Sequence, residues 1–357
     1  MGAVCDMALT LTSLSQVVDL GFDEIIDVRS PAEWAEDHVP GAISLPVLDD
    51  EERARVGTIY KQESPFRARK IGAALVARNA ARHLEGPLID KPGGWRPLVY
   101  CWRGGQRSGS FAMILSQIGW RVDTLAGGYK SYRGLVVAEV YDTPVRAPVI
   151  VLDGNTGTAK TELLGLLAAR GVQVIDLEGL ANHRGSLFGA RSGGQPSQKA
   201  FEGRLAFALA ALDPARPVVV EAESSKIGDC RMPPRLWRAM IGAPRIAVAA
   251  PLEARAAYLA RAYGDLTADA EALAGVIDRL RPMQAAETIE RWQGMAAVGE
   301  FELLAAELMA RHYDPRYAKQ RSLTAAPMPL TVEADSLAPE ALPGIADRLV
   351  AAISTLG

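Results

Sequence analysis

The stretch Tyr100-Cys-Trp-Arg-Gly-Gly-Gln-Arg-Ser-Gly-Ser110 decides the fold of the first part of this chain. The apolar run before it, 96–100, is typical of a short strand, and the run after it, 111–119, is typical of a helix that ends at a glycine. Between such a strand and such a helix, loop amides and the helix dipole attract negative charge. The same field stabilises a thiolate, so we expect Cys101 to be a catalytic nucleophile. The alternative is a buried cysteine that packs as a small hydrophobe.

The loop that follows Cys101 is predicted to bind an anion. Its spacing, Cys101-x5-Arg107, is that of cysteine phosphatases, and it is one residue longer than the loop common in sulfurtransferases. A loop of this length accepts a tetrahedral phosphorus group as well as a sulfane sulfur. The predicted anion loop consists of Trp102, Arg103, Gly104, Gly105, Gln106 and Arg107.

The composition limits the possible classes of function. The chain has 357 residues, enough for about two domains, and 49% of them are hydrophobic. Its formal net charge is −3, so any contact with nucleic acid must use local patches. The three cysteines form no Cys-x-x-Cys pair and the four histidines are scattered, which argues against a structural metal site or a disulfide framework. No signal peptide and no apolar run of membrane-spanning length is visible, so we expect a cytoplasmic protein without membrane association.

Strands and helices alternate along most of the chain, which predicts the α/β class with largely parallel sheets. We expect a small α/β domain over residues 1–143 and a second α/β domain over residues 144–357. Residues from about 253 to 320 read as helical and rich in arginine, and they are a candidate lid or RNA-binding surface.

A second anion site follows the buried strand predicted at 149–153. The segment Gly154-Asn-Thr-Gly-Thr-Ala-Lys-Thr161 fits the phosphate-binding pattern G-x-x-x-x-G-K-[ST], except that Ala159 replaces the second glycine. The methyl group of Ala159 penalises any positive φ at that position. The predicted phosphate-binding residues are Gly154, Asn155, Thr156, Gly157, Thr158, Lys160 and Thr161.

Within this second site, Lys160 is expected to neutralise the phosphate charge, and Thr161 is a candidate Mg²⁺ ligand. The acidic partner usual in such sites would be Glu221 or Glu223, which follow a predicted strand. Because glutamate stands there instead of aspartate, ATP hydrolysis is a weaker inference than phosphate binding.

Several motifs resemble known families. Asp27-Val28-Arg29-Ser30-Pro31-x-Glu33, His38-Val39-Pro40-Gly41-Ala42 and Gly127-Gly128-Tyr129, together with Tyr100-Cys101, resemble the rhodanese domain. With the second anion site and the segments 177–189, 195–202 and 221–228, the chain resembles the tRNA 2-selenouridine synthase family. The resemblance implies that Asp27 and Arg29 are scaffold residues and that Cys101 carries sulfur or selenium.

The resemblance also implies a reaction and its substrates. Members of that family act on the wobble uridine of tRNA that carries 2-thiouridine. The sulfur is alkylated by geranyl diphosphate, and selenium from selenophosphate then displaces it. Two phosphorylated reagents match two anion sites, so we expect geranyl diphosphate at residues 154–161 and selenophosphate at the Cys101 loop. No tightly bound cofactor is expected, and a selenophosphate-supplying enzyme is an expected partner.

A third group of residues is predicted to lie in the outer part of the second site or to contact tRNA. His183 is either an acid or base, or simply a surface residue. The basic side chains could pair with tRNA phosphates. The group consists of His183, Arg184, Glu221, Glu223, Ser224 and Lys226.

Three other readings remain open. The first is a P-loop kinase or NTPase whose rhodanese domain relays sulfur, which predicts ATP turnover that depends on Lys160. The second is a Cys-x5-Arg phosphatase, although Tyr100 stands where those enzymes usually have histidine. The third is a catalytically silent RNA-binding module, against which the intact Cys101 and Lys160 argue.

Overall fold

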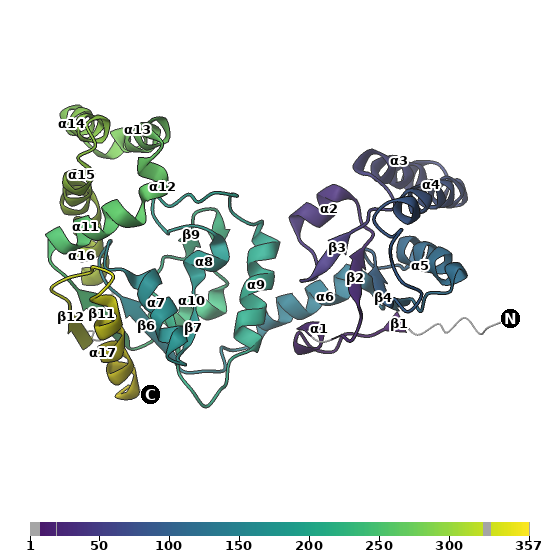
Figure 1. Ribbon diagram of the computed structural model, residues 1–357, viewed down its shortest axis with the longest axis horizontal. Helices are drawn as coiled ribbons and strands as arrows, with labels where there is room; N and C mark the ends of the chain where they lie inside the picture. The colour runs from purple at the N-terminus through teal and green to yellow at the C-terminus, as the bar shows by residue number, and fades with distance from the viewer. Residues whose placement is uncertain (1–7, 19, 324–329, 357) are drawn as a thin grey trace. The chain divides into compact units, whose positions relative to one another are not determined.

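The computed structural model describes residues 8–18, 20–323 and 330–356, and these residues form two compact units (Figure 1). The first unit contains the described residues up to Thr143 and the segment Pro196–Ala211. The second unit contains Pro144–Gln195 and the described residues from Leu212 onward. Both units are mixed α/β, as the alternation of strands and helices predicts.

The first unit is built on a five-stranded parallel sheet of order β1-β5-β4-β2-β3. Its central strand β4 is buried at every position, because helices cover both faces of the sheet. The strands are β1 (Ala8–Leu9), β2 (Glu24–Asp27), β3 (Ala42–Ser44), β4 (Pro97–Tyr100) and β5 (Asp123–Leu125). The helices are α1 (Ser15–Val18), α2 (Pro31–Glu36), α3 (Asp50–Gln62), α4 (Pro65–Glu85), α5 (Gln106–Ile118), α6 (Gly128–Val137) and the π-helix η1 (Ala138–Asp142).

One helix of the first unit comes from a distant part of the sequence. Helix α9 (Gln198–Ala210) packs on α6 and η1. Glu202, buried on α9, pairs with Arg133 and accepts a hydrogen bond of 2.6 Å from Tyr141 Oη. The first unit therefore includes a helix that follows the phosphate-binding segment in the chain.

The second unit is built on a parallel sheet of order β12-β11-β6-β8-β7. Strand β6 lies in the middle, and its neighbour β8 comes later in the chain, so the loops after both strands meet at one edge of the sheet. The strands are β6 (Val149–Asp153), β7 (Gln173–Ile175), β8 (Val218–Glu221), β11 (Arg245–Ala249) and β12 (Leu330–Glu333). The helices near the sheet are α7 (Lys160–Ala169), α8 (Leu177–Ala181), α10 (Pro234–Ile241) and α17 (Leu342–Ser354), and a small hairpin is formed by β9 (Lys226–Ile227) and β10 (Cys230–Arg231).

The helical segment predicted after residue 253 forms a cluster with its own core. Trp292 is fully buried at its centre among leucines and isoleucines. The elements are α11 (Leu252–Ala262), α12 (Gly264–Thr267), α13 (Ala270–Asp278), the 3-10 helix η2 (Arg281–Met283), α14 (Ala286–Ala297), α15 (Phe301–Leu308), the π-helix η3 (Met309–Tyr313) and α16 (Asp314–Leu323). Among the described residues, none of the helices combines the length and the apolar character that crossing a membrane requires.

Candidate active sites

Cys101 lies at the carboxyl end of β4, at the bottom of the predicted anion loop. Its side chain is buried, and Ser108 Oγ donates a hydrogen bond to Sγ at 3.3 Å. Gly105 has φ +71°, which turns the loop into the N-terminus of α5. The amides at this helix start are therefore available to an anion above the thiol.

Gly128 supports the same loop from below. It has φ +58°, and a Cβ placed there would lie 2.3 Å from the carbonyl oxygen of Cys101. This close approach lets the Tyr129 amide donate to that carbonyl at 2.8 Å. Only glycine fits at position 128, because a side chain would push the Cys101 backbone out of place.

The two arginines of the loop have different environments. Arg107 donates to both carboxylate oxygens of Glu33, at 2.7 and 3.3 Å, whereas Arg103 is exposed. Burial acts to raise the pKa of Glu33, but the bonds and charge of Arg107 outweigh it and hold that pKa below its usual value. Arg107 therefore links the start of α5 to α2 through Glu33. The exposed side chain of Arg103 can turn toward an incoming anion.

The expected scaffold residues lie beside this loop. Arg29 is buried and forms a forked ion pair with Asp27, with Nη2 2.6 Å from Oδ2. Its guanidinium lies 4.0 Å from the ring centroid of Tyr129, on which Trp102 also stacks. These contacts fix the walls of the Cys101 loop without placing Arg29 in it.

The phosphate-binding segment follows β6 and adopts a cradle that requires unusual backbone angles. A Cβ at Gly154 would lie 2.4 Å from Thr158 Oγ1, and one at Gly157 would lie 3.0 Å from the carbonyl oxygen of Arg255. Ala159 has φ +58°, a conformation that costs an L-residue about 1–2 kcal/mol. Lys160 Nζ donates to the carbonyl oxygen of Gly154 at 3.0 Å, so its charge lies over the cradle.

A pair of carboxylates faces this cradle. Thr161 Oγ1 donates to Glu178 Oε2 at 3.0 Å, and Glu178 lies in hydrogen-bonding contact with Glu223. Burial, together with the charge of Glu178, raises the pKa of Glu223 to about 8. A Cβ at Gly185 would lie 2.5 Å from Glu223, so only a glycine at this position lets the loop after α8 pass close to the two carboxylates.

Of the two acids offered by the sequence, only Glu223 lines the cavity above the cradle. Glu221 lies deeper, where it accepts a hydrogen bond of 2.7 Å from the Glu178 amide, and burial raises its pKa well above the usual value. Glu178 was not among the predicted site residues. Its sequence signal was weak, namely an acid in the first turn of the short helix α8.

The other predicted outer residues separate into two groups. Arg184 lines the cavity and pairs with Asp265 at 2.7 Å. His183 does not line it. Its Nδ1 accepts a hydrogen bond of 3.1 Å from the Gly185 amide, and burial lowers its pKa, so the ring holds the loop in place. Ser224 and Lys226 are exposed and also lie outside the cavity.

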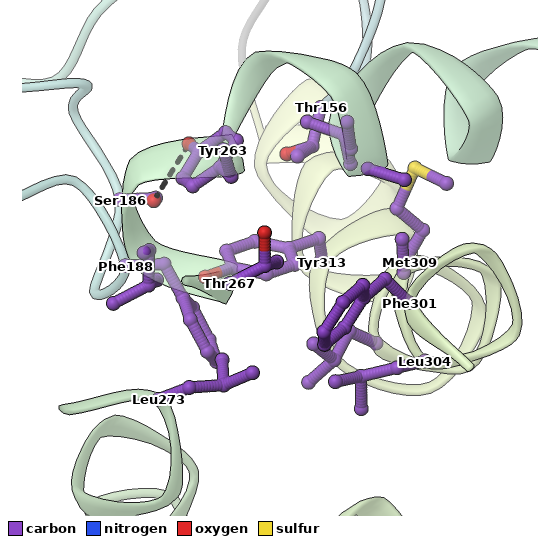
Figure 2. A pocket seen from close by; sticks show the side chains of 15 residues that line it. Thr156, Ser186, Phe188, Tyr263, Thr267, Leu273, Phe301, Leu304, Met309 and Tyr313 are labelled. Atoms are coloured by element: carbon purple, nitrogen blue, oxygen red, sulfur yellow. Dashed lines mark hydrogen bonds between the residues drawn. The ribbon is translucent and has the colours of Figure 1, made fainter. Parts of the chain in front are cut away.

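Two cavities meet at the phosphate-binding segment. The polar one encloses about 1040 Å³ of space open to solvent and is lined by the cradle, the carboxylate pair, Arg184 and Arg191. The apolar one spans about 550 Å³, a volume that also includes space open to solvent, and it extends into the helical cluster (Figure 2). Its far part is lined by Phe188, Leu266, Leu273, Phe301, Leu304 and Leu308.

The sequence pattern does not predict the apolar cavity. Most of its lining comes from α11, α12, α13, α15 and η3, whose pattern reads as ordinary amphipathic helices with an apolar face toward a core. Part of the apolar face of these helices lines a cavity, and this depends on how the helices pack against one another.

The described residues contain no group of three or more His, Cys, Asp or Glu side chains arranged to hold a metal ion. The hydroxyl of Thr161, at the start of α7, and the carboxylate of Glu178 lie 3.0 Å apart and are oxygen ligands of the kind that suits Mg²⁺.

Comparisons with known proteins agree with both halves of this architecture. Residues 10–135 match the family model of the rhodanese-like domain, and residues 147–278 match that of the tRNA 2-selenouridine synthase AAA domain. A crystal structure of the N-terminal domain of a putative ATP/GTP binding protein from Clostridium difficile is 33% identical, with a TM-score of 0.32, over 37% of this chain and 99% of that one.

Two full-length relatives are also similar. The tRNA 2-selenouridine synthase of Pseudomonas syringae pv. syringae is 34% identical over 85% of this chain and 89% of that protein. The protein of the same name from Chromohalobacter salexigens is 34% identical over 83% of this chain and 87% of its own length. With such identity across most of both sequences, this chain belongs to the tRNA 2-selenouridine synthase family of enzymes.

Proposed function

We propose that this enzyme replaces sulfur by selenium in 2-thiouridine at the wobble position of tRNA. In the first step, geranyl diphosphate alkylates the sulfur to give S-geranyl-2-thiouridine. In the second step, selenium from selenophosphate displaces the geranylated sulfur, which leaves as a thiolate. The names of the relatives support a tRNA substrate and selenium, and the chemistry of the two sites supports the reagents.

The observation that carries the proposal is the pair of adjacent cavities, which share the lining residues Thr156, Ser186, Leu259, Tyr263 and Tyr313. Geranyl diphosphate has a charged end and an apolar end, and it needs a polar cavity and an apolar cavity side by side. The polar cavity contains Lys160 and the amides of the cradle, which suit a diphosphate. The apolar cavity offers a lining of leucine and aromatic side chains, which suits a prenyl chain.

Lys160 is assigned to the departing diphosphate. As the bond between carbon and oxygen breaks, negative charge grows on the leaving group, and an ammonium group held at the cradle stabilises it. Mg²⁺ at Thr161 is a further proposal. Thr161 and Glu178 supply hard oxygen ligands, and the bound metal would neutralise part of the diphosphate charge.

The Cys101 loop is assigned to selenophosphate. The N-terminus of α5 and Arg103 suit its phosphoryl oxygens, and Cys101 lies at the bottom of the loop. Its thiolate would attack phosphorus, so that the phosphorus–selenium bond breaks and selenide is released to displace the geranylated sulfur. Water would then remove the phosphoryl group from Cys101 as phosphate. Cys101 packs in the core of the first unit and its Sγ also accepts a hydrogen bond from Ser108, so its assignment to the chemistry rests on its place at the bottom of the anion loop.

The test separates the two steps with two variants. Cys101→Ser is expected to make S-geranyl-2-thiouridine from geranyl diphosphate but no 2-selenouridine. Lys160→Ala is expected to lose geranylation. Mass spectrometry of nucleosides from a 2-thiouridine tRNA incubated with each reagent gives both readouts. If Lys160→Ala geranylates normally while Cys101→Ser does not, the assignment of the sites is wrong.

The same proteins test the kinase or NTPase alternative. Rapid ATP hydrolysis that depends on Lys160, without any change in tRNA nucleosides, would support that alternative and contradict the proposal. Comparing reactions with Mg²⁺ and with a chelator tests the metal separately.

A further inference from the structure

Hydroxyl-bearing side chains lie at the junction of the two cavities. Ser186, Tyr263 and Tyr313 line both the polar and the apolar cavity, together with Thr156 and Leu259. Ser186 Oγ lies 3.4 Å from Tyr263 Oη. In Figure 2, Tyr313 lies in the middle of the pocket, with Ser186 and Tyr263 on one side and Met309 and Phe301 on the other.

Both tyrosines stay protonated at neutral pH. Burial raises the pKa of Tyr263 to about 12 and raises that of Tyr313 further. The groups are therefore hydrogen-bond donors, and neither is a base. The Tyr313 oxygen is buried without a well-formed hydrogen bond to any described group, although Ser186 lies close enough to oppose the rise of its pKa.

A buried donor without a partner is costly, by about 1–3 kcal/mol, and such groups in native proteins call for an explanation. The cost is removed when a ligand supplies the missing acceptor. At this position the acceptor would lie between a diphosphate in the polar cavity and a hydrocarbon chain in the apolar one.

Tyr313 is also held at a fixed place relative to the cradle. Its neighbour Asp314 accepts hydrogen bonds of 2.8 and 3.0 Å from Arg255. Arg255 in turn donates to the carbonyl oxygen of Thr156 at 3.2 Å, and Asn155 donates to Asp314 at 3.1 Å. The Arg255–Asp314 ion pair therefore links the phosphate-binding turn to the backbone next to Tyr313.

We propose that the hydroxyls of Tyr313 and Tyr263 donate hydrogen bonds to the bridging oxygen of an allylic diphosphate, and that both tyrosines are catalytic. This inference rests on the proposed function. In such a substrate the bond between carbon 1 and the bridging oxygen joins the polar half to the apolar half, so it must lie where the two cavities meet.

The reaction at this point is balanced. The bond between carbon 1 and oxygen breaks, and its electron pair remains on the diphosphate. A lone pair of the thiocarbonyl sulfur forms the new bond to carbon 1, and the proton on N3 of the uridine is lost to solvent. The tyrosine hydroxyls keep their protons, and their hydrogen bonds strengthen as charge grows on the departing oxygen.

The test is S-geranylation of a 2-thiouridine anticodon stem-loop by the full chain without selenophosphate. We expect Tyr313→Phe to lower kcat about 100-fold while the KM for geranyl diphosphate changes less than about twofold. Tyr263→Phe should act in the same direction. Tyr132→Phe, which removes a buried tyrosine hydroxyl from α6 of the first unit, should match the wild type.

A second substrate distinguishes catalysis from a structural effect. In geranyl thiolodiphosphate a sulfur atom replaces the bridging oxygen, and sulfur accepts hydrogen bonds poorly. The loss caused by Tyr313→Phe should then nearly disappear. If Tyr313→Phe lowers kcat equally with both substrates, or changes only KM, the inference about the tyrosines is wrong. The proposed function still stands in that case, as long as the wild-type protein geranylates the RNA. Absence of wild-type geranylation overturns both.

Discussion

At the scale of single residues, Glu223 makes stability depend on pH. Its pKa is about 8 in the folded protein against an ordinary value of 4.5, because it is buried beside Glu178. Between these values the folded state holds a proton that the unfolded state has released. This contribution to stability is therefore complete below pH 4.5 and is lost as the pH rises through 8. We expect Glu223→Gln to flatten the fall in the free energy of unfolding between pH 5 and 8.5, measured by urea titration. An unchanged slope would mean that Glu223 is ionised in the folded protein.

Gly128 gives a second prediction at this scale. Gly128→Ala places a methyl group 2.3 Å from the Cys101 carbonyl oxygen at a positive φ, so we expect it to destabilise the first unit by about 2 kcal/mol and to abolish selenation. Gly134→Ala is the matched control on the same helix, where nothing lies within 4 Å of the added Cβ. It should be neutral or stabilise by up to about 1 kcal/mol. Thermal unfolding of the two variants, with geranylation as an activity that Gly128→Ala retains, checks both expectations.

At the scale of elements, the Arg255–Asp314 pair links α11, α16 and the phosphate-binding turn. Arg255 is almost fully buried and Asp314 is about one quarter exposed. Asp314→Asn leaves a buried guanidinium without its charge partner, so we expect a loss of about 2 kcal/mol in the free energy of unfolding, together with weaker diphosphate binding. The control is Asp347→Asn, which breaks the ion pair of an exposed aspartate with Arg170 and should cost under about 0.5 kcal/mol. Equal effects in urea titrations would contradict a special role for the Arg255 link.

The elements also explain how much of the site could be predicted from the sequence. The Cys101 loop and the segment 154–161 were predictable because each is a local strand–loop–helix unit whose glycines and charges are adjacent in sequence. The partner of Arg107 is Glu33, which lies 74 positions away, and no motif or spacing in the sequence indicates this pair. The junction of Tyr263 and Tyr313 depends on how helices of similar amphipathic pattern pack, which no spacing within one helix encodes.

At the scale of the whole molecule, the two proposed reaction steps use different compact units. Cys101 lies in the first unit and Lys160 in the second, and each unit has its own hydrophobic core. We therefore expect an equimolar mixture of Cys101→Ser and Lys160→Ala proteins to make 2-selenouridine, because geranylated tRNA released by one variant can be selenated by the other. The measurement is nucleoside mass spectrometry, with each variant alone as the control. A mixture that fails, while the wild type succeeds, would mean that both steps must occur on one protein molecule without release of the tRNA.

The position of α9 has a consequence for how the protein is made. A ribosome delivers the chain from its N-terminus, so the first unit still lacks Glu202 and the rest of α9 after Thr143 has emerged. Strands β6 and β7 of the second unit are synthesised before that helix. They cannot form their sheet until β8, β11 and β12 have also been synthesised. Apolar strands of the second sheet are therefore exposed while the first unit is still incomplete, the situation in which nascent chains depend most on chaperones. The order of synthesis thus couples the folding of two units that have separate cores.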